Sequence, residues 1–280
     1  MSDFSSFDNR YYIIADIVME RPLHIGRGAS LEPIGTDLPV IKTPDDKPYI
    51  PGSSIKGVLR TQFEKYVRTM FSQNVKLNGK QLNACDILDE KNRCITVKKR
   101  TDFEKEVKQT YKKEEYDEKL TQKIIENSCT ACILFGSHEM ASKIYIKDAF
   151  LDNVPIKTEI RDGVAIDRDT GTAKSGAKFD YEIVPAGTSF KFEAIIENVE
   201  LLELGLFALI LKSWERGEIV IGGKTSAGMG WGMLKNIELK CVEKSDIIDF
   251  LVSGKKKPAD LNEFVNQLRK KLKKEGDVHA

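Results

Sequence analysis

Four cysteines carry the clearest chemical signal in the sequence. Two residues separate Cys129 from Cys132, which places two thiols on one tight turn, and Cys85 and Cys94 supply a second pair in the same polar region. Four thiolates satisfy the tetrahedral coordination that a structural zinc ion prefers. We therefore expect Cys85, Cys94, Cys129 and Cys132 to bind one structural Zn²⁺.

The ligand set is less well determined by the sequence than the metal. Eight residues separate Cys85 from Cys94, more than in the usual short zinc knuckle, and His138 is an alternative ligand in place of one cysteine. Unrelated buried thiols are the other interpretation. Cys241 lies in a predicted strand and is left out of the site.

Glycine is concentrated in residues 222–232, where five of the eleven residues are glycine. Gly223, Lys224 and Thr225 resemble the end of a P-loop, but that motif requires glycine where Glu218 stands. The segment also precedes a strand instead of opening a helix, so we do not expect ATP binding. Glycines let backbone amides approach phosphates, to which Lys224 would add charge; a tight turn is the alternative.

Hydrophobic periodicity predicts the elements that position these residues. A helix begins at Ser53 or Ser54 as N-cap and continues to residue 71. The predicted strands are 11–19, 143–151, 189–199 and 233–242, and a second, apolar helix covers 201–214. The order strand, helix, strand, strand, helix, strand is that of an α+β, ferredoxin-like (RRM-like) fold, in which helices cover one face of an antiparallel sheet.

Composition divides the chain further. Residues 1–71 and 128–242 are predicted to form the core, and the polar stretch 72–132 an insertion that holds the cysteines, with a helix near 105–125. Residues 243–280 are predicted to form a helical, lysine-rich tail. Such a polar insertion gains folding energy from a metal ion, which favours a structural role for the zinc.

The overall composition excludes some classes of protein. No apolar run approaches the roughly 20 residues of a membrane span, so we expect no membrane association and a cytoplasmic location. A net charge of +1 is no signature of nucleic-acid binding. Basic clusters at 98–100, 255–257 and 269–274 are interpreted as solvated surface. Lys56 and Arg60, one turn apart near a helix N-terminus, are placed to attract phosphate.

Four segments together resemble the CRISPR-associated RAMP superfamily of antiviral defence, in the family's order: 23–26, 50–57, 166–171 and 222–232. The chain is most similar to the repeated backbone subunit of type III effector complexes, in a zinc-bearing variant. The resemblance implies binding of guide RNA (crRNA). The residues expected to contact it are His24, Arg27, Ser53, Ser54, Lys56, Arg60, Arg161, Arg168, Gly222, Gly223, Lys224, Thr225 and Ser226.

The resemblance also implies that residues of about 156–188 form a β-hairpin thumb that crosses the guide–target duplex. Arg161 and Arg168 would then meet phosphates, and Val164 or Ile166 would insert between bases. Taken without the family, the stretch is a loop rich in turn formers and charges.

Asp37 is the expected catalytic residue, because the resemblance places an aspartate just before a Pro-Val-Ile run, as in residues 36–41. RNA cleavage through its own 2′-hydroxyl needs in-line geometry, proton removal and charge stabilisation. Aspartate is a weak base at neutral pH, so holding Mg²⁺ or Mn²⁺ is at least as plausible a role. The resemblance implies metal-dependent cleavage that leaves a 2′,3′-cyclic phosphate. Capping of a turn is the alternative.

Three function classes follow. The first is a guide-binding subunit that cleaves complementary target RNA, and the second is the same scaffold without cleavage. The third is a guide-processing endoribonuclease, for which His24 is the candidate acid or base. In the first two, the chain would repeat head-to-tail along the guide, beside other type III subunits.

Overall fold

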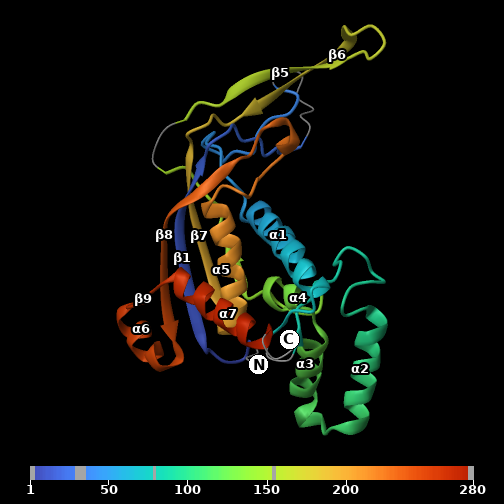
Figure 1. Ribbon diagram of the computed structural model, residues 1–280, viewed down its shortest axis with the longest axis vertical. Coiled ribbons are helices and arrows are strands. Elements are labelled where there is room, and N and C mark those ends of the chain that lie inside the picture. The colour runs from blue at the N-terminus through green and yellow to red at the C-terminus, as the bar shows by residue number, and fades with distance from the viewer. Residues whose placement is uncertain (1–3, 29–35, 78–79, 153–155, 277–280) are drawn as a thin grey trace.

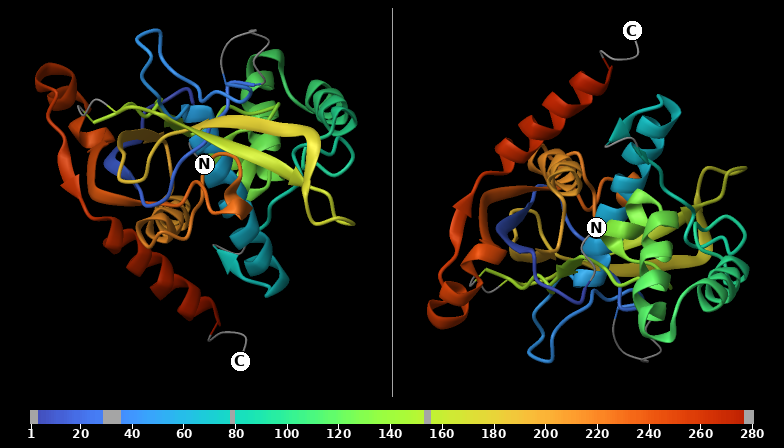
Figure 2. Two further views of the ribbon diagram at one scale, coloured as in Figure 1. Left: turned by 90° about the horizontal axis from the view of Figure 1, so that it is seen from above. Right: turned by 90° about the horizontal axis from the view of Figure 1, so that it is seen from below.

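The computed structural model describes residues 4–28, 36–77, 80–152 and 156–276 (Figure 1). The molecule is elongated. A β-hairpin of β5 (Glu159–Ile166) and β6 (Ala173–Ile183) lies at one end, and helices α2 and α3 lie at the other. Seen along the long axis, the hairpin lies across the top of the core (Figure 2).

An antiparallel sheet of five strands forms the centre. Its order is β4 (Ile144–Ile146), β7 (Ser189–Glu197), β1 (Asn9–Met19), β8 (Gly232–Glu243) and β9 (Lys257–Ala259). The prediction of an α+β fold is confirmed. The strand predicted at 143–151 is shorter than expected, and β9 was not predicted.

β1 shows how the sequence pattern forms the sheet. Tyr11, Ile13, Ala15, Ile17 and Met19 are buried and point to one face, as period-two alternation requires. Most residues between them are only half-buried, so the opposite face of β1 is partly exposed over most of its length.

Helices α1 (Gly52–Ser72) and α5 (Leu201–Glu215) pack in the core with the sheet. Ile55, Leu59, Phe63 and Val67 are buried at four-residue spacing on α1. α5 is apolar on nearly all sides because α7 (Leu261–Gly276) covers its outer surface. A side-chain carbon added at Gly205 would lie 2.9 Å from Cβ of Leu268 on α7, so this crossing requires glycine.

The start of α1 corrects the predicted N-cap. The helix begins at Gly52, so Ser53 and Ser54 lie inside its first turn. The amide of Gly52 donates to Oδ1 of Asp148 at 2.7 Å, so this carboxylate takes the role expected of a serine.

The segment predicted to be an insertion contains several helices and a short hairpin. It holds β2 (Lys76–Leu77), β3 (Lys80–Gln81), α2 (Val97–Thr110), the 3₁₀ turn Lys113–Glu115, α3 (Tyr116–Asn127) and α4 (Thr130–Phe135). The helix expected near 105–125 is two helices, because α2 ends at Thr110. They form a hairpin with a small core of Val107, Leu120 and Ile124.

The tail adds a 3₁₀ turn (Lys244–Asp246), α6 (Ile247–Ser253), β9 and α7. The predicted basic run 269–274 falls on α7, and the side chains beyond residue 272 lie outside the described part. Among the described helices, none combines the length and the apolar composition needed to cross a bilayer.

Candidate functional site

An open groove of about 490 Å³ lies between α1 and two loops. Ser53, Ser54 and Gly57 line it from the first turns of α1, and Gly26 lines it from the loop after β1. Gly222 and Gly223 complete it from the glycine-rich loop. The groove therefore brings together Ser53 and Ser54 with Gly222 and Gly223, four residues from two distant segments that the sequence analysis expected to contact RNA.

The glycine-rich loop packs directly against the segment that follows β1. The amide of Gly223 donates to the carbonyl oxygen of His24 at 2.8 Å, and that of Gly230 donates to Pro22 at 2.8 Å. Gly222 has a φ of +88°, and an added side-chain carbon there would lie 2.5 Å from the His24 oxygen. Glycine at position 222 is thus required by backbone packing as well as by its φ.

Lys224 joins the glycine-rich loop to the hairpin. Its ammonium lies 4.5 Å from the ring centre of Tyr181 and 4.9 Å from that of Phe179, both on β6. Thr225 and Ser226 follow in the 3₁₀ turn Thr225–Ala227, and Ser226 is exposed. The positive end of Lys224 is therefore directed at aromatic rings of the protein.

His24 is buried, with 7% of its surface exposed. Its Nδ1 lies 2.7 Å from the carbonyl oxygen of Glu182, so Nδ1 carries the proton in this hydrogen bond. The ring also meets Tyr181 edge-on, with centroids 6.3 Å apart. Nε2 faces Gly26, since an added side-chain carbon there would lie 3.3 Å from it.

Asp37 is exposed and pairs with Asp180 on β6. The amide of Asp37 donates to Oδ1 of Asp180 at 2.7 Å, and the amide of Asp180 donates to Oδ2 of Asp37 at 2.9 Å. Leu38 forms a parallel bridge with Tyr181 beside this pair. One oxygen of the Asp37 carboxylate is therefore fixed by the hairpin. Residues 34 and 35 of the motif around Asp37 lie outside the described residues.

Glu182 fastens the same loop and was not singled out from the sequence. Its side chain bonds the amide of Val40 at 3.0 Å and the ammonium of Lys42 at 2.7 Å. Burial opposes ionisation, but hydrogen bonds from Lys42, Thr158 and Val40 outweigh it and lower the pKa of Glu182. In the sequence, the feature that could have indicated Glu182 is an acidic residue between Tyr181 and the apolar pair Ile183–Val184.

The predicted cations fall into two groups. Arg27 is exposed beside the groove segment, and Arg161 and Arg168 are exposed on the hairpin. Lys56 instead donates to the carbonyl oxygen of Ile144 at 3.2 Å, and burial, followed by the charge of Arg60, lowers the pKa of its ammonium. Arg60 lies at the cysteine cluster and not at the groove.

The hairpin exposes apolar side chains along β5. The exposed fractions of Ile160, Val164 and Ile166 are 65%, 50% and 65%. Phe179 covers Gly163 on the paired strand, at a site where any larger residue would collide with the ring. The predicted hairpin is therefore present, and it presents the residues expected to insert between bases.

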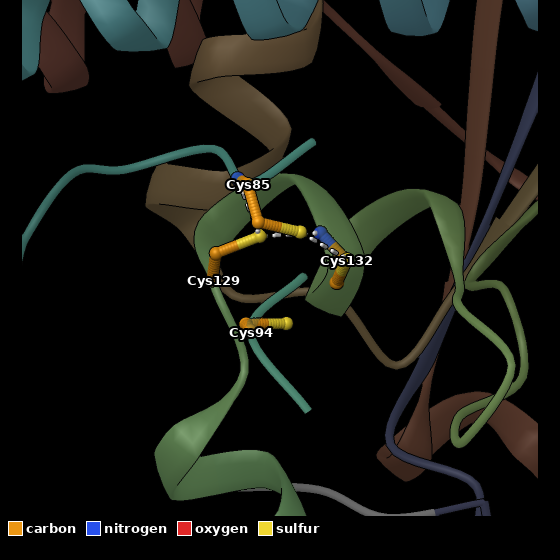
Figure 3. A group of neighbouring side chains, drawn as sticks. All are labelled: Cys85, Cys94, Cys129 and Cys132. Atoms are coloured by element: carbon orange, nitrogen blue, oxygen red, sulfur yellow. Dashed lines mark hydrogen bonds between the residues drawn. The ribbon is translucent and has the colours of Figure 1, made fainter. Parts of the chain in front are cut away.

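The four predicted cysteines converge in space (Figure 3). Their sulfur atoms all lie within 4.8 Å of one another, and those of Cys85 and Cys132 are 3.6 Å apart. A tetrahedral zinc with Zn–S bonds of about 2.3 Å requires sulfur separations of about 3.8 Å, so the arrangement fits such an ion. His138 is exposed and outside this group, so within the described residues the cluster that could hold a metal consists of the four cysteines.

Two backbone amides donate hydrogen bonds to one sulfur of the cluster. The amides of Cys85 and Cys132 both donate to Sγ of Cys129 at 3.4 Å. Hydrogen bonds from Cys132, then from Cys85, lower the pKa of the Cys129 thiol to about 7. Thiolate at this position is the form that binds a metal.

Comparisons with known proteins identify the family of the chain. The model of the RAMP superfamily matches residues 16–234. Over 270 residues, the chain is 26% identical to "CRISPR system Cms endoribonuclease Csm3" of Methanocaldococcus jannaschii, covering 92% of this chain and 91% of that protein. A protein of the same name from Methanothermobacter thermautotrophicus is 45% identical over 60 residues, 21% of this chain and 24% of the relative. Because the family model covers most of the chain, the protein belongs to the RAMP superfamily.

Proposed function

We propose that this protein is a guide-RNA-binding backbone subunit of a type III CRISPR effector complex and cleaves complementary target RNA at Asp37. The relative from Methanocaldococcus jannaschii, similar over nearly its whole length, is named an endoribonuclease of a CRISPR system. The observation that carries the proposal is the meeting of the groove, the glycine-rich loop and the Asp37 loop at the base of one exposed hairpin.

The groove supports guide binding through the RNA backbone. Ser53 and Ser54 lie in the first turn of α1, where the helix dipole favours phosphate and the two serine hydroxyls can donate hydrogen bonds to it. Gly222 and Gly223 are exposed and have no side chain, so the RNA backbone can approach them closely. Contacts of this kind do not read base sequence, so binding should be insensitive to guide sequence and sensitive to salt.

Asp37 would act while its carboxylate is held by the Asp180 amide. In the proposed reaction the 2′-oxygen of the target attacks its neighbouring phosphorus, the 5′-oxygen leaves, and a 2′,3′-cyclic phosphate remains. An exposed carboxylate is a ligand type suited to Mg²⁺ or Mn²⁺. The chemistry that such an ion supplies when bound is acidification of the attacking hydroxyl and neutralisation of phosphorane charge.

The same proposal includes a fold type, domain bounds and a metal for the cysteine cluster. The strand order β4-β7-β1-β8 with α1 and α5 supports a ferredoxin-like core, formed by residues 1–71 and 128–242. Residues 72–132 would be the insertion and 243–280 the tail. We assign the four cysteines a structural Zn²⁺. One equivalent of zinc in the purified chain, lost on substitution of Cys94 by Ser, would support this assignment, and an absence of metal would contradict it.

Assembly follows from the proposed binding mode. A subunit that covers a short stretch of guide must repeat along it, so copies should contact head-to-tail together with other type III subunits in the cytoplasm. Arg161 and Arg168 on the hairpin would contact phosphates of the guide–target duplex, and Arg27 would contact the guide.

The test reconstitutes the chain with guide RNA and its effector partners and follows a labelled complementary target with Mg²⁺ or Mn²⁺. Asp37→Ala should abolish regularly spaced cuts while guide binding persists. Asp45→Ala, an exposed aspartate eight residues along the chain, is the matched control and should cleave normally. Target binding without cuts by the wild type would leave the chain as a scaffold.

The guide-processing alternative has its own test. His24 is buried and its Nδ1 is engaged by Glu182, which favours a positioning role over proton transfer. Maturation of guide precursor by the isolated chain that is lost in His24→Ala would contradict the backbone-subunit proposal.

A further inference from the structure

We propose that Glu182 is a positioning residue that couples the Asp37 loop to the hairpin, so that Asp37 moves with β6. This inference rests on the proposed function of Asp37 as the cleavage centre. It concerns a residue that does not itself touch the target and acts through the loop that it holds.

The Glu182 side chain has three partners on two segments. Only 10% of this side chain is exposed. Its Oε2 accepts from the amide of Val40 at 3.0 Å, and its Oε1 contacts Nζ of Lys42 at 2.7 Å. The hydroxyl of Thr158, just before β5, also donates to Oε1. One carboxylate therefore ties the loop to both strands of the hairpin.

The backbone of Glu182 adds two hydrogen bonds to the same region. Its amide donates to the carbonyl oxygen of Leu38 at 3.0 Å, and its carbonyl oxygen accepts from Nδ1 of His24 at 2.7 Å. His24 in turn holds Gly223 through its own carbonyl oxygen. The contacts of Glu182 thus reach the segments that line the groove and carry the proposed cleavage residue.

Strand geometry explains why Glu182 acts together with Asp180. The two residues are two apart on β6, so their side chains point to the same face of the strand. That face meets the loop, since Asp180 exchanges hydrogen bonds with Asp37 while Glu182 holds Val40 and Lys42. The pair of carboxylates fixes the loop at two points on opposite sides of Leu38.

This arrangement gives the hairpin control over Asp37. Besides its contacts with β6, the loop around Asp37 is held by backbone hydrogen bonds to the segment after β1, in which the amide of Arg27 donates to Pro39 and the amide of Ile41 donates to Ile25. A change in the angle of the hairpin when duplex RNA binds would be passed to Asp37 through β6. In-line attack is sensitive to placement, and a 1 Å displacement can lower a rate by about 100-fold.

The experiment measures single-turnover cleavage and target affinity in the reconstituted complex. The variants are Glu182→Gln, Glu182→Ala and Asp37→Ala, with Glu193→Gln as the matched control. Glu193 lies on β7, is half-exposed and pairs with Lys147, away from the loop. We expect Glu182→Ala to cleave about 100-fold more slowly with target Kd changed less than twofold. Glu182→Gln, which keeps an acceptor for Val40, should recover part of this loss, and Glu193→Gln should match the wild type.

A second readout does not depend on cleavage. Amide hydrogen exchange in the isolated chain should accelerate at residues 37–42 in Glu182→Ala, less in Glu182→Gln, and not at all in Glu193→Gln. A residue that only stabilised the fold would instead accelerate exchange throughout the central sheet.

The outcomes separate this inference from the proposed function. Wild-type cleavage by Asp37→Ala would overturn the cleavage centre, whatever Glu182 does. An inactive Asp37→Ala together with wild-type rates in both Glu182 variants would overturn the positioning role alone. Equal loss of rate and of target affinity would overturn it too, because it would show a binding role. If Glu182→Ala fails to assemble, the cleavage rate and the amide hydrogen exchange of Glu182→Gln decide whether Glu182 is a positioning residue.

Discussion

Arg60 on α1 donates a hydrogen bond from Nη2 to the sulfur of Cys132 at 3.6 Å. The same guanidinium donates to Glu64 and to the carbonyl oxygen of Gly136. Burial opposes its charge, but the bonds to Glu64 and Cys132 outweigh this and raise the pKa of Arg60. A zinc ion with four thiolates carries a net charge of −2, which a guanidinium in contact with one sulfur offsets.

Arg60→Gln should therefore weaken metal retention by about 10- to 100-fold, as the loss of groups that contact metal ligands typically does. Competition with a chromogenic chelator measures the affinity. Lys65→Gln, an exposed residue of the same helix, serves as the control and should bind zinc normally. Unchanged zinc affinity in Arg60→Gln would show that the sulfur contact contributes nothing to the site.

Two glycines of the same loop allow the energetic cost of a positive φ to be distinguished from the cost of a steric collision. Gly222 and Gly228 both have a φ of +88°, but a side-chain carbon at Gly222 would strike the His24 oxygen while Gly228 faces open space. Gly228→Ala should lose about 1–2 kcal/mol in free energy of unfolding from its φ alone. Gly222→Ala should lose about a further 1–3 kcal/mol from the collision. Urea unfolding measures both, and equal losses would mean that the loop relaxes away from His24.

The ionisation of Glu182 predicts a pH dependence of stability. Because the folded state lowers its pKa below the ordinary value of 4.5, the carboxylate stabilises the fold at pH above that value. This contribution is lost as pH falls through the lowered pKa of the folded state. The difference in unfolding free energy between wild type and Glu182→Gln should thus be largest near neutral pH and shrink below about pH 4. A difference that is constant down to pH 3 would contradict the assignment.

Ile166 on the hairpin gives a test of the thumb. Its side chain is 65% exposed, so Ile166→Ser should change the free energy of unfolding by no more than about 0.5 kcal/mol. Target cleavage in the assembled complex should nevertheless fall, because a hydroxymethyl group cannot replace an apolar side chain between bases. Ile248→Ser on α6, 74% exposed at a different part of the molecule, is the matched control. Equal cleavage by the two variants would argue against insertion by Ile166.

Elements with strong local periodicity were predicted well from the sequence. Phe190, Phe192, Ala194 and Ile196 alternate along β7 and are all buried, so the pattern and the burial coincide. β9 was missed because Lys257, Pro258 and Ala259 have no such pattern and become a strand only by pairing with β8. The N-terminus of α1 was misplaced because its partner, Asp148, is 96 residues away.

The candidate sites also include parts that could be predicted from the sequence and parts that could not. The cysteine cluster could be predicted because the coordination chemistry resides in the residue type and the cysteines are few. The contacts of Asp37 with Asp180 could not, since they join residues 143 apart along the chain. Arg60 was assigned to RNA because its helix position suggested phosphate, whereas its partners lie 72 and 76 residues further along.

β9 has a consequence for how copies of this protein can meet. It adds only three residues to the side of β8, and Pro258 at its centre lacks the amide that a further strand would need. Lys255 and Lys256 precede this strand and repel a like-charged neighbour. That border of the sheet disfavours addition of a further strand, so a neighbouring copy that approached it would contact side chains and not the backbone.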